Sequence, residues 1–302
     1  MDRYWTFLRC AQRSALFLGS FALALAGLIA GNTRPALAEF EIQESGVEKG
    51  EVELEYRGAV HDGFPRAERE EADEEEGEGA LEEEEEGEFL RQSHDFEFQY
   101  GLTNRILFST TLGTDEPLDD DFNLSSVEVE LQYELVKRKG NGLGLAFTGG
   151  YGFATRGGEA DELEFGPIME LASGKFLLTT NTFFSSQVGK HKETDGLGFE
   201  YGWRGEYDFA RHWGIGVEMF GEIEDLSNAG SFDDQPHSIG PTLFYNPGEE
   251  EEEEGGENGD DDEEDKVAEG PEMELSLNVG VQFGLTDATS DTAVKFQGGL
   301  AF

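Results

Sequence analysis

The sequence is short of cysteine, of basic residues and of long apolar runs, and each shortage excludes a class of protein. The single cysteine, Cys10, lies in the first 38 residues, so we expect a mature chain without disulfides or thiolate chemistry. Lys and Arg number 21 against 67 Asp and Glu, and this acidity argues against nucleic-acid binding, which needs a basic surface. After residue 38 no apolar run approaches the roughly 20 residues that a membrane helix requires.

Aromatic residues and glycine are plentiful despite the net charge of −46. The chain has 24 Phe and 41 Gly among its 302 residues. A disordered acidic chain would be poor in aromatic residues, so most of this one is expected to fold. Apolar residues make up 37% of the chain, which is low for a compact soluble enzyme of this length.

The first 38 residues have the three parts of a secretory signal peptide. Arg3, Arg9 and Arg13 give a positive start, an apolar stretch of small residues follows over 14–30, and Ala36-Leu37-Ala38 offers a cleavage site. The pattern predicts a signal peptide over 1–38 with cleavage before Glu39, and an uncleaved anchor helix is the alternative. Residues 39–302 would then form the mature protein.

Two acidic blocks interrupt the remainder. Residues 61–92 contain 15 acidic and 3 basic residues, and residues 248–270 contain 14 acidic and 1 basic residue. Such low-complexity stretches cannot bury a core. The sequence therefore predicts two disordered acidic segments, an extracellular loop over 61–92 and an insertion over 248–270.

Elsewhere apolar residues recur at every second position, which is the period of a β-strand. Twelve stretches follow this rule: 52–60, 96–100, 106–112, 127–135, 143–153, 163–171, 176–184, 197–209, 213–223, 239–245, 273–285 and 294–302. Most approach the roughly 9–11 residues of a tilted membrane strand, whereas strands of soluble sandwiches are nearer five or six. The sequence predicts an all-β fold, a transmembrane antiparallel up-and-down β-barrel of about twelve strands.

The connections support this interpretation because short and long ones alternate. Short turns lie at 103–105, 137–141, 173–175 and 210–212, and each carries a basic residue. Bacterial barrels have short periplasmic turns and long extracellular loops. The segment 248–270 breaks the rule, because counting strands places it on the periplasmic side. Either it is a periplasmic insertion or the strand count is wrong.

The chain ends on an apolar alternation that closes with Leu300 and Phe302. This ending resembles the C-terminal strand that outer-membrane assembly machinery recognises. The expected partners are therefore that machinery, contacted through the strand ending at Phe302, and the lipid of a bacterial outer membrane.

Two short elements carry a family resemblance. The segment Phe96-Glu-Phe-Gln-Tyr-Gly-Leu-Thr-Asn-Arg105 and the ending Val281-Gln-Phe-Gly-Leu-Thr-Asp-Ala-Thr-Ser-Asp-Thr292 each contain Gly-Leu-Thr-Asn or Gly-Leu-Thr-Asp. They resemble outer-membrane proteins of the "MetA-pathway of phenol degradation" family. The resemblance, which spans 49–302 apart from the acidic blocks, implies an outer-membrane barrel that passes small, often aromatic or apolar molecules. It implies no catalytic residues, and the acidic insertions depart from the family pattern.

A barrel turns its apolar residues to lipid and its polar residues to the lumen. The inward set here is acidic, and such a lumen should hold water and attract cations. In the alternative interpretation the carboxylates pair with the few bases or are protonated, and the lumen is too narrow to conduct. The expected pore-lining residues are Glu55, Glu97, Glu130, Glu164, Arg204, Glu206 and Glu218.

Other chemistry has weaker support in the sequence. Four histidines, His61, His94, His191 and His237, fall near the predicted extracellular rim, but none has metal-motif spacing. Hard divalent cations could bind the Glu runs weakly. The chain has no Gly-x-Ser-x-Gly element, and the mature chain has no Cys nucleophile. We therefore expect no enzyme, no cofactor and no dedicated metal site.

The sequence thus predicts an outer-membrane channel or transporter-like barrel for passive uptake of small solutes, with an acidic, cation-favouring lumen. One alternative is a surface or structural barrel whose acidic loops bind cations or partners. An outer-membrane hydrolase is a further alternative with less support.

Overall fold

The computed structural model describes residues 40–63, 90–117, 122–155, 159–192, 194–246 and 273–302. They form twelve strands and one 3₁₀ turn, Phe232–Asp234. The strands are β1 (Val52–Asp62), β2 (Leu90–Gly101), β3 (Ile106–Pro117), β4 (Asn123–Val136), β5 (Gly142–Ala154), β6 (Asp161–Ser173), β7 (Phe176–Val188), β8 (Gly198–Ala210), β9 (Trp213–Ile223), β10 (His237–Tyr245), β11 (Glu274–Gly284) and β12 (Thr292–Ala301).

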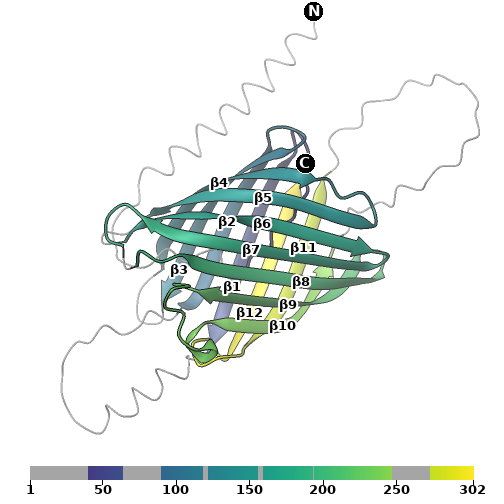
Figure 1. Ribbon diagram of the computed structural model, residues 1–302. Helices are drawn as coiled ribbons and strands as arrows, with labels where there is room; N and C mark the ends of the chain where they lie inside the picture. The colour runs from purple at the N-terminus through teal and green to yellow at the C-terminus, as the bar shows by residue number, and fades with distance from the viewer. Residues whose placement is uncertain (1–39, 64–89, 118–121, 156–158, 193, 247–272) are drawn as a thin grey trace, which may run out of the picture.

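The strands close into a single antiparallel barrel in chain order (Figure 1). Each strand pairs with its neighbours in sequence, and β1 pairs with β12 to complete the ring. Strands of 9–14 residues suit a tilted crossing of a bilayer. The predicted fold class and the predicted strand count are both confirmed.

The alternation in sequence becomes an inward and an outward face. On β4, Leu131 is 54% exposed on the outside, whereas its neighbours Glu130 and Gln132 are buried inside. The outward positions of the other strands carry the same kind of exposed apolar side chain, for example Ile215 and Val279. A soluble barrel has the opposite distribution, so this surface is suited to lipid. Among the described residues, no helix is long and apolar enough to cross a membrane.

A charge on the outer wall should therefore destabilise the barrel. Leu131 lies in the middle of β4 and faces outward. We expect Leu131→Arg to lower the free energy of unfolding in lipid by about 2–4 kcal/mol, the cost of Arg near the bilayer midplane. Urea titration of the barrel in vesicles would measure the loss. An unchanged midpoint would mean that this face does not contact lipid.

The two ends of the barrel differ in their connections. At one end, here called the short-turn end, β2–β3, β4–β5, β6–β7 and β8–β9 are joined by links of two to five residues. The opposite end, here called the long-loop end, carries the links β1–β2, β3–β4, β5–β6, β7–β8, β9–β10 and β11–β12. Strand β10 ends and β11 begins at the short-turn end, so the predicted strand count is correct and the block 248–270 links two strand ends on that side. That block lies outside the described residues.

The first acidic block is shorter than the sequence suggested. Strand β1 continues to Asp62, and β2 begins at Leu90, so both ends of 61–92 are strand rather than loop. The register continues there, because His61 and Asp62 still pair with Ala293 and Thr292 of β12. Residues 64–89 and the predicted signal peptide 1–38 lie outside the described residues.

Two loops at the long-loop end are joined by hydrogen bonds to one carboxylate. The hydroxyl of Thr194 donates to Asp225 over 2.6 Å, and the backbone and hydroxyl of Ser227 donate over 2.8 and 2.6 Å. The bonds from Ser227 and Thr194 lower the pKa of Asp225, because they favour its ionised form. The carboxylate thus connects the β7–β8 loop to the β9–β10 loop across the rim.

Candidate functional site

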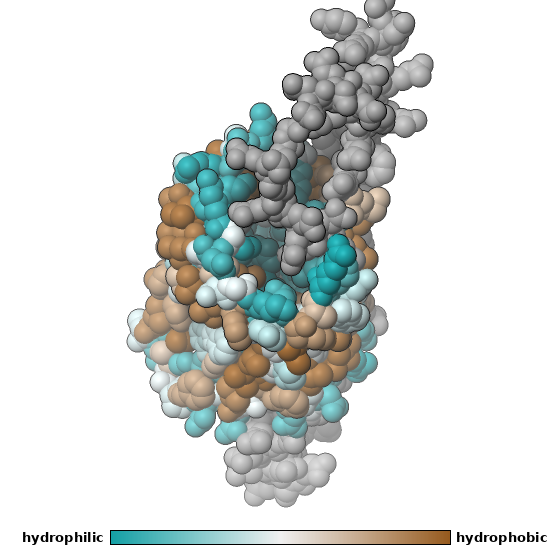
Figure 2. Space-filling model, turned by 90° about the vertical axis from the view of Figure 1, so that its right-hand side faces the viewer, coloured by the Kyte–Doolittle hydropathy of each residue, from teal (hydrophilic) through white to brown (hydrophobic). Residues whose placement is uncertain are grey.

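The interior of the barrel is the candidate functional site. Figure 2 looks at the short-turn end and shows hydrophilic residues around a central recess, with hydrophobic residues around the outer wall. Most buried side chains of the described residues are polar or charged, and they come from the inward positions of nearly every strand. Buried apolar residues also occur inside, where Ala146, Ile168 and Phe183 form a cluster. The lumen is therefore less uniformly acidic than the sequence suggested.

Part of this interior is filled by residues 40–50, here called the luminal segment. At the short-turn end the Gly50 amide donates to the Gly101 carbonyl over 2.8 Å. Toward the long-loop end the Phe40 ring lies 5.2 Å from Phe220 and 5.9 Å from His61, measured between ring centroids. An extended chain of this length reaches about 35 Å, comparable with the roughly 30 Å core of a bilayer. The luminal segment thus runs along much of the barrel, ahead of the first strand, and the sequence assigned no structure to these residues of the predicted mature chain 39–302.

Side chains of the wall bind the backbone of the luminal segment. Asn181 of β7 accepts from the Gln43 amide over 2.6 Å and donates to the Gln43 carbonyl over 3.0 Å. Gln132 of β4 donates to the Glu44 carbonyl over 3.0 Å, and Glu170 of β6 accepts from the Ser45 amide over 3.1 Å. Polar side chains here satisfy buried backbone groups that strand pairing would otherwise satisfy. The luminal segment is therefore seated in the barrel without belonging to its sheet.

The fit also depends on small residues in the wall and apolar residues in the luminal segment. Val47 is 2% exposed and Ile42 is 7% exposed. A Cβ at Gly202 would lie 3.2 Å from the Glu41 carbonyl oxygen and 3.4 Å from Ile42. A Cβ at Gly101 would collide with the carbonyl of Glu48. Both glycines give the luminal segment room to pass.

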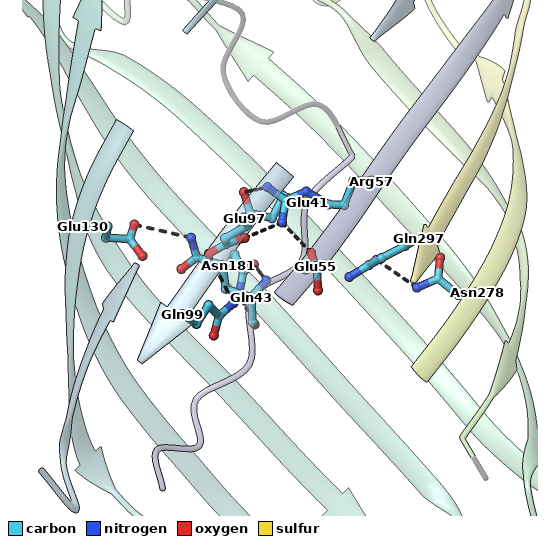
Figure 3. Close-up of polar contacts among 10 residues, drawn as sticks. All are labelled: Glu41, Gln43, Glu55, Arg57, Glu97, Gln99, Glu130, Asn181, Asn278 and Gln297. Carbon is cyan, nitrogen blue, oxygen red and sulfur yellow. Dashed lines mark hydrogen bonds and ion pairs between the residues drawn. The ribbon is translucent and has the colours of Figure 1, made fainter. Parts of the chain in front are cut away.

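Arg57 on β1 is the centre of the first charged group (Figure 3). Its guanidinium donates to Glu55 over 2.5 Å and to Glu97 over 2.7 Å, and it lies 3.1 Å from a carboxylate oxygen of Glu41. Glu55 and Glu97 are directly opposite each other in the β1–β2 register, and Arg57 follows Glu55 on the same face. The cation compensates two carboxylates of the wall and one of the luminal segment.

Two further cations are each paired. Arg204 on β8 contacts Glu44 of the luminal segment at 2.9 Å and Glu206 at 3.7 Å, and it lies 5.2 Å from the centre of the Phe244 ring. The Lys295 ammonium on β12 donates to Glu218 over 2.6 Å. Thr242 donates to the same carboxylate oxygen of Glu218 over 2.6 Å.

Two of the expected pore residues lie together without a cation. Glu130 and Glu164 form a group with Glu128, in which one carboxylate oxygen of each lies within 4.8 Å of the others. Glu130 accepts a hydrogen bond from the Gln43 side chain over 3.3 Å. Glu164 is 9% exposed, and within the described ranges no hydrogen bond or ion pair reaches it.

All seven expected pore residues face the interior, and the structure sorts them into these groups. Glu55, Glu97, Glu206, Glu218 and Arg204 belong to ion pairs, whereas Glu130 and Glu164 do not. Sequence reasoning missed the luminal segment and its main partner, Asn181. The available signal was weak. It consisted of one amide side chain, Asn181, at an inward position of β7, where the neighbouring polar residues are mostly Thr and Ser.

Within the described residues the histidines belong to no cluster of metal-ligating side chains. His94 is on the outward face of β2 and bonds the Tyr56 hydroxyl at 2.7 Å, and His237 contacts the Tyr201 hydroxyl at 3.1 Å. His61 is on the inward face of β1, where it stacks with Phe40. His212, which lies near Asp208 and Arg211 in the sequence, bonds the backbone carbonyl of Asn246 at 3.2 Å.

The two elements behind the family resemblance lie at opposite ends of the barrel. At 101–104, Thr103 accepts from the amides of Arg105 and Ile106 over 3.2 and 3.0 Å and forms a short turn. At 284–287, Thr286 donates to the Gln235 carbonyl over 2.6 Å at the long-loop end. Their shared residues therefore support two separate turns rather than a repeated site.

The sequence matches no known family model and no curated protein, so the predicted family is not confirmed. Solved structures of similar form include the NanC porin, with 9% identity and a TM-score of 0.46, covering 82% of this chain and 98% of that one. The KdgM porin, in complex with disordered oligogalacturonate, has 8% identity and a TM-score of 0.43, covering 83% and 98%. The Acinetobacter baumannii outer membrane protein Omp33 has 10% identity and a TM-score of 0.37, covering 84% and 98%. Similarity at this level assigns no residue or substrate.

Proposed function

We propose that this chain is a bacterial outer-membrane channel for the passive movement of small solutes, and that the luminal segment narrows its path. The observation that carries the proposal is the seating of the luminal segment. Apart from the Gly50 amide at its end, which bonds the Gly101 carbonyl, its backbone is bound by side chains of the wall such as Asn181 and Gln132. It can therefore leave the lumen without breaking the barrel.

The chemistry of the described lumen favours cations. Its three buried cations, Arg57, Arg204 and Lys295, are each held in ion pairs. The group of Glu128, Glu130 and Glu164 adds three carboxylates that form no ion pair among the described residues. A water-filled path with this balance concentrates cations and repels anions. Release of the luminal segment would also break the ion pairs Glu41–Arg57 and Glu44–Arg204. Both arginines would keep their partners on the wall, Glu97 and Glu206.

Three features support the placement in an outer membrane. The outer wall of the barrel is apolar, and the chain carries a predicted signal peptide over 1–38 and an apolar ending at Phe302. Cleavage before Glu39 would leave one residue ahead of Phe40. The luminal segment would then have a free end toward the long-loop end and a covalent tether at Val52, at the short-turn end.

Ion selectivity tests the proposed function. We expect the purified barrel in a planar bilayer under a KCl gradient to be selective for K⁺. Its reversal potential should be shifted from zero toward the equilibrium potential of K⁺. The double variant Glu130→Gln, Glu164→Gln removes two uncompensated carboxylates and should move that potential toward zero. A wild-type barrel that prefers chloride would contradict the proposed selectivity.

A surface anchor is the second candidate, because the luminal segment fills part of the interior. An anchor needs no path, and its acidic blocks would perform the binding. Removal of the luminal segment distinguishes the two functions. An anchor would still pass no current, whereas a channel would pass more current than the wild type.

A further inference from the structure

A group of three carboxylates that forms no ion pair among the described residues faces the lumen between β4 and β6. Glu128 and Glu130 are two residues apart on β4 and therefore point to the same side. Glu164 is on β6, with β5 between. One carboxylate oxygen from each of the three lies within 4.8 Å of the other two. Three negative groups at this separation repel one another strongly unless a cation lies among them.

Glycines of β5 create the space in which the carboxylates converge. Gly150 pairs with Glu130 on one side and with Glu164 on the other, so the three form one row across the sheet. The next row repeats the pattern, with Gly152 between Glu128 and Glu162. A Cβ at Gly150 would lie 2.6 Å from a carboxylate oxygen of Glu128. The glycine thus opens a gap in the wall, and Glu128 occupies its edge.

Two acidic side chains beside this gap have carboxylate oxygens without a hydrogen-bond or ion-pair partner among the described residues. Glu164 is 9% exposed, and no hydrogen bond or ion pair reaches it from the described parts of the chain. One carboxylate oxygen of Glu200, on β8, is also fully buried without a hydrogen-bond partner among the described residues. The charges acting most strongly on Glu164 come from Glu200, Glu128 and Glu130, all of them acidic. Burial of a carboxylate without compensation is costly, so Glu164 indicates that a positive ligand belongs in the gap.

We propose that Glu128, Glu130 and Glu164 form a binding site for a hard divalent cation, with Ca²⁺ as the ion that fits the ligands best. Calcium binds carboxylate oxygens at about 2.3–2.6 Å, so two ligands on opposite sides of the ion are separated by roughly 5 Å. Oxygens within 4.8 Å of one another meet this condition without a change in the backbone. Water in the lumen completes the coordination shell, and the Gln43 side chain keeps its hydrogen bond to Glu130.

Calcium binding to the purified, folded barrel tests the site, with titration calorimetry as the readout. We expect a saturable site whose affinity falls about tenfold or more in Glu164→Gln and in Glu128→Gln, because each removes one charged ligand. The control is Glu134→Gln, which changes another inward and buried carboxylate farther along β4. Its calcium affinity should equal that of the wild type.

The acidic blocks are also expected to bind calcium weakly in such an assay, so a second measurement locates the ion. Crystals soaked in Mn²⁺ should show an anomalous scattering peak between Glu130 and Glu164, and Glu164→Gln crystals should lack it. Equal calcium affinity in the wild type and Glu164→Gln, or no peak at this position, would overturn the proposal. Neither measurement depends on ion flow. Loss of the calcium site would therefore leave the proposed channel function intact, and absence of ionic current would leave the calcium site intact.

Folding of the variants is checked by their heat-dependent migration on gels. Glu164→Gln replaces a buried charge with a neutral group of the same shape, so we expect the variant to fold. Gly150→Ala offers an independent test, because its methyl group would displace the Glu128 carboxylate while every ligand remains. It should weaken calcium binding, and an unchanged affinity would contradict the role of the gap.

Discussion

Deleting residues 40–48 is expected to raise the single-channel conductance of the barrel severalfold. The deletion removes side chains that fill the lumen, among them the buried Ile42 and Val47, and spares the strand pairing. Lys49 and Gly50 are retained, because the Gly50 amide bonds the Gly101 carbonyl at the short-turn end. The measurement is conductance in a planar bilayer at fixed salt concentration.

The same deletion removes Glu41 and Glu44, and a control separates charge from bulk. The double variant Glu41→Gln, Glu44→Gln keeps the luminal segment and loses its two contacts with Arg57 and Arg204. If obstruction by the chain limits the current, this variant should conduct much less than the deletion. Equal conductance of the wild type and the deletion would show that the luminal segment does not obstruct the path.

Replacing Arg57 by Met should destabilise the barrel by about 3–5 kcal/mol, the usual effect of removing one partner of a buried ion pair. Arg57 is 4% exposed and contacts Glu55, Glu97 and Glu41. Without the guanidinium the three carboxylates face one another in a confined space. Urea unfolding in vesicles measures the loss in the free energy of unfolding.

Two comparisons make the Arg57 result specific. The triple variant Arg57→Met, Glu55→Gln, Glu97→Gln removes the repulsion and should recover much of the lost stability. Arg91→Met affects a half-exposed ion pair with Glu116 at 3.5 Å and should cost less than about 1 kcal/mol. If Arg57→Met lowered the free energy of unfolding no more than Arg91→Met does, the ion pairs of Arg57 would not stabilise the barrel.

The barrel could be predicted from sequence because its signal is repeated twelve times. A one-residue slip in any strand would turn charges such as Glu130 to lipid and Leu131 to the lumen, so the alternation fixes which side chains face inward. Strand ends were less certain. His61 and Asp62 have the composition of the acidic block that follows, yet their pairing with β12 keeps them in the wall.

Which charged side chains lie together depends on the register between neighbouring strands. The alternation within a single strand does not reveal this register. The inward positions of Glu55 and Glu97 were evident, but the antiparallel pairing that sets them opposite each other depends on a connection outside the described residues. The Glu130–Gly150–Glu164 row likewise needs two registers at once. A list of inward carboxylates therefore could not separate those with a cation from those without.

The luminal segment could not be predicted, because its contacts are distant in sequence. Gln43 and Asn181 are 138 positions apart, and nothing near either residue indicates the other. Residues 40–50 show no strand alternation, and their backbone partners are side chains that the barrel brings together only once it has closed. The sequence therefore left these residues as an unassigned start of the mature chain.

One experiment tests most directly whether the lumen is the path and the luminal segment its obstruction. A Cβ at Gly144 would touch the Ser45 hydroxyl, so cysteines in Ser45→Cys, Gly144→Cys are close enough to form a disulfide. With Cys10 in the predicted signal peptide, they would be the only cysteines of the mature chain. In one bilayer, the oxidised barrel should stay at a low conductance, and transitions to a higher level should begin after a reductant is added. Identical transitions before and after reduction would contradict the account.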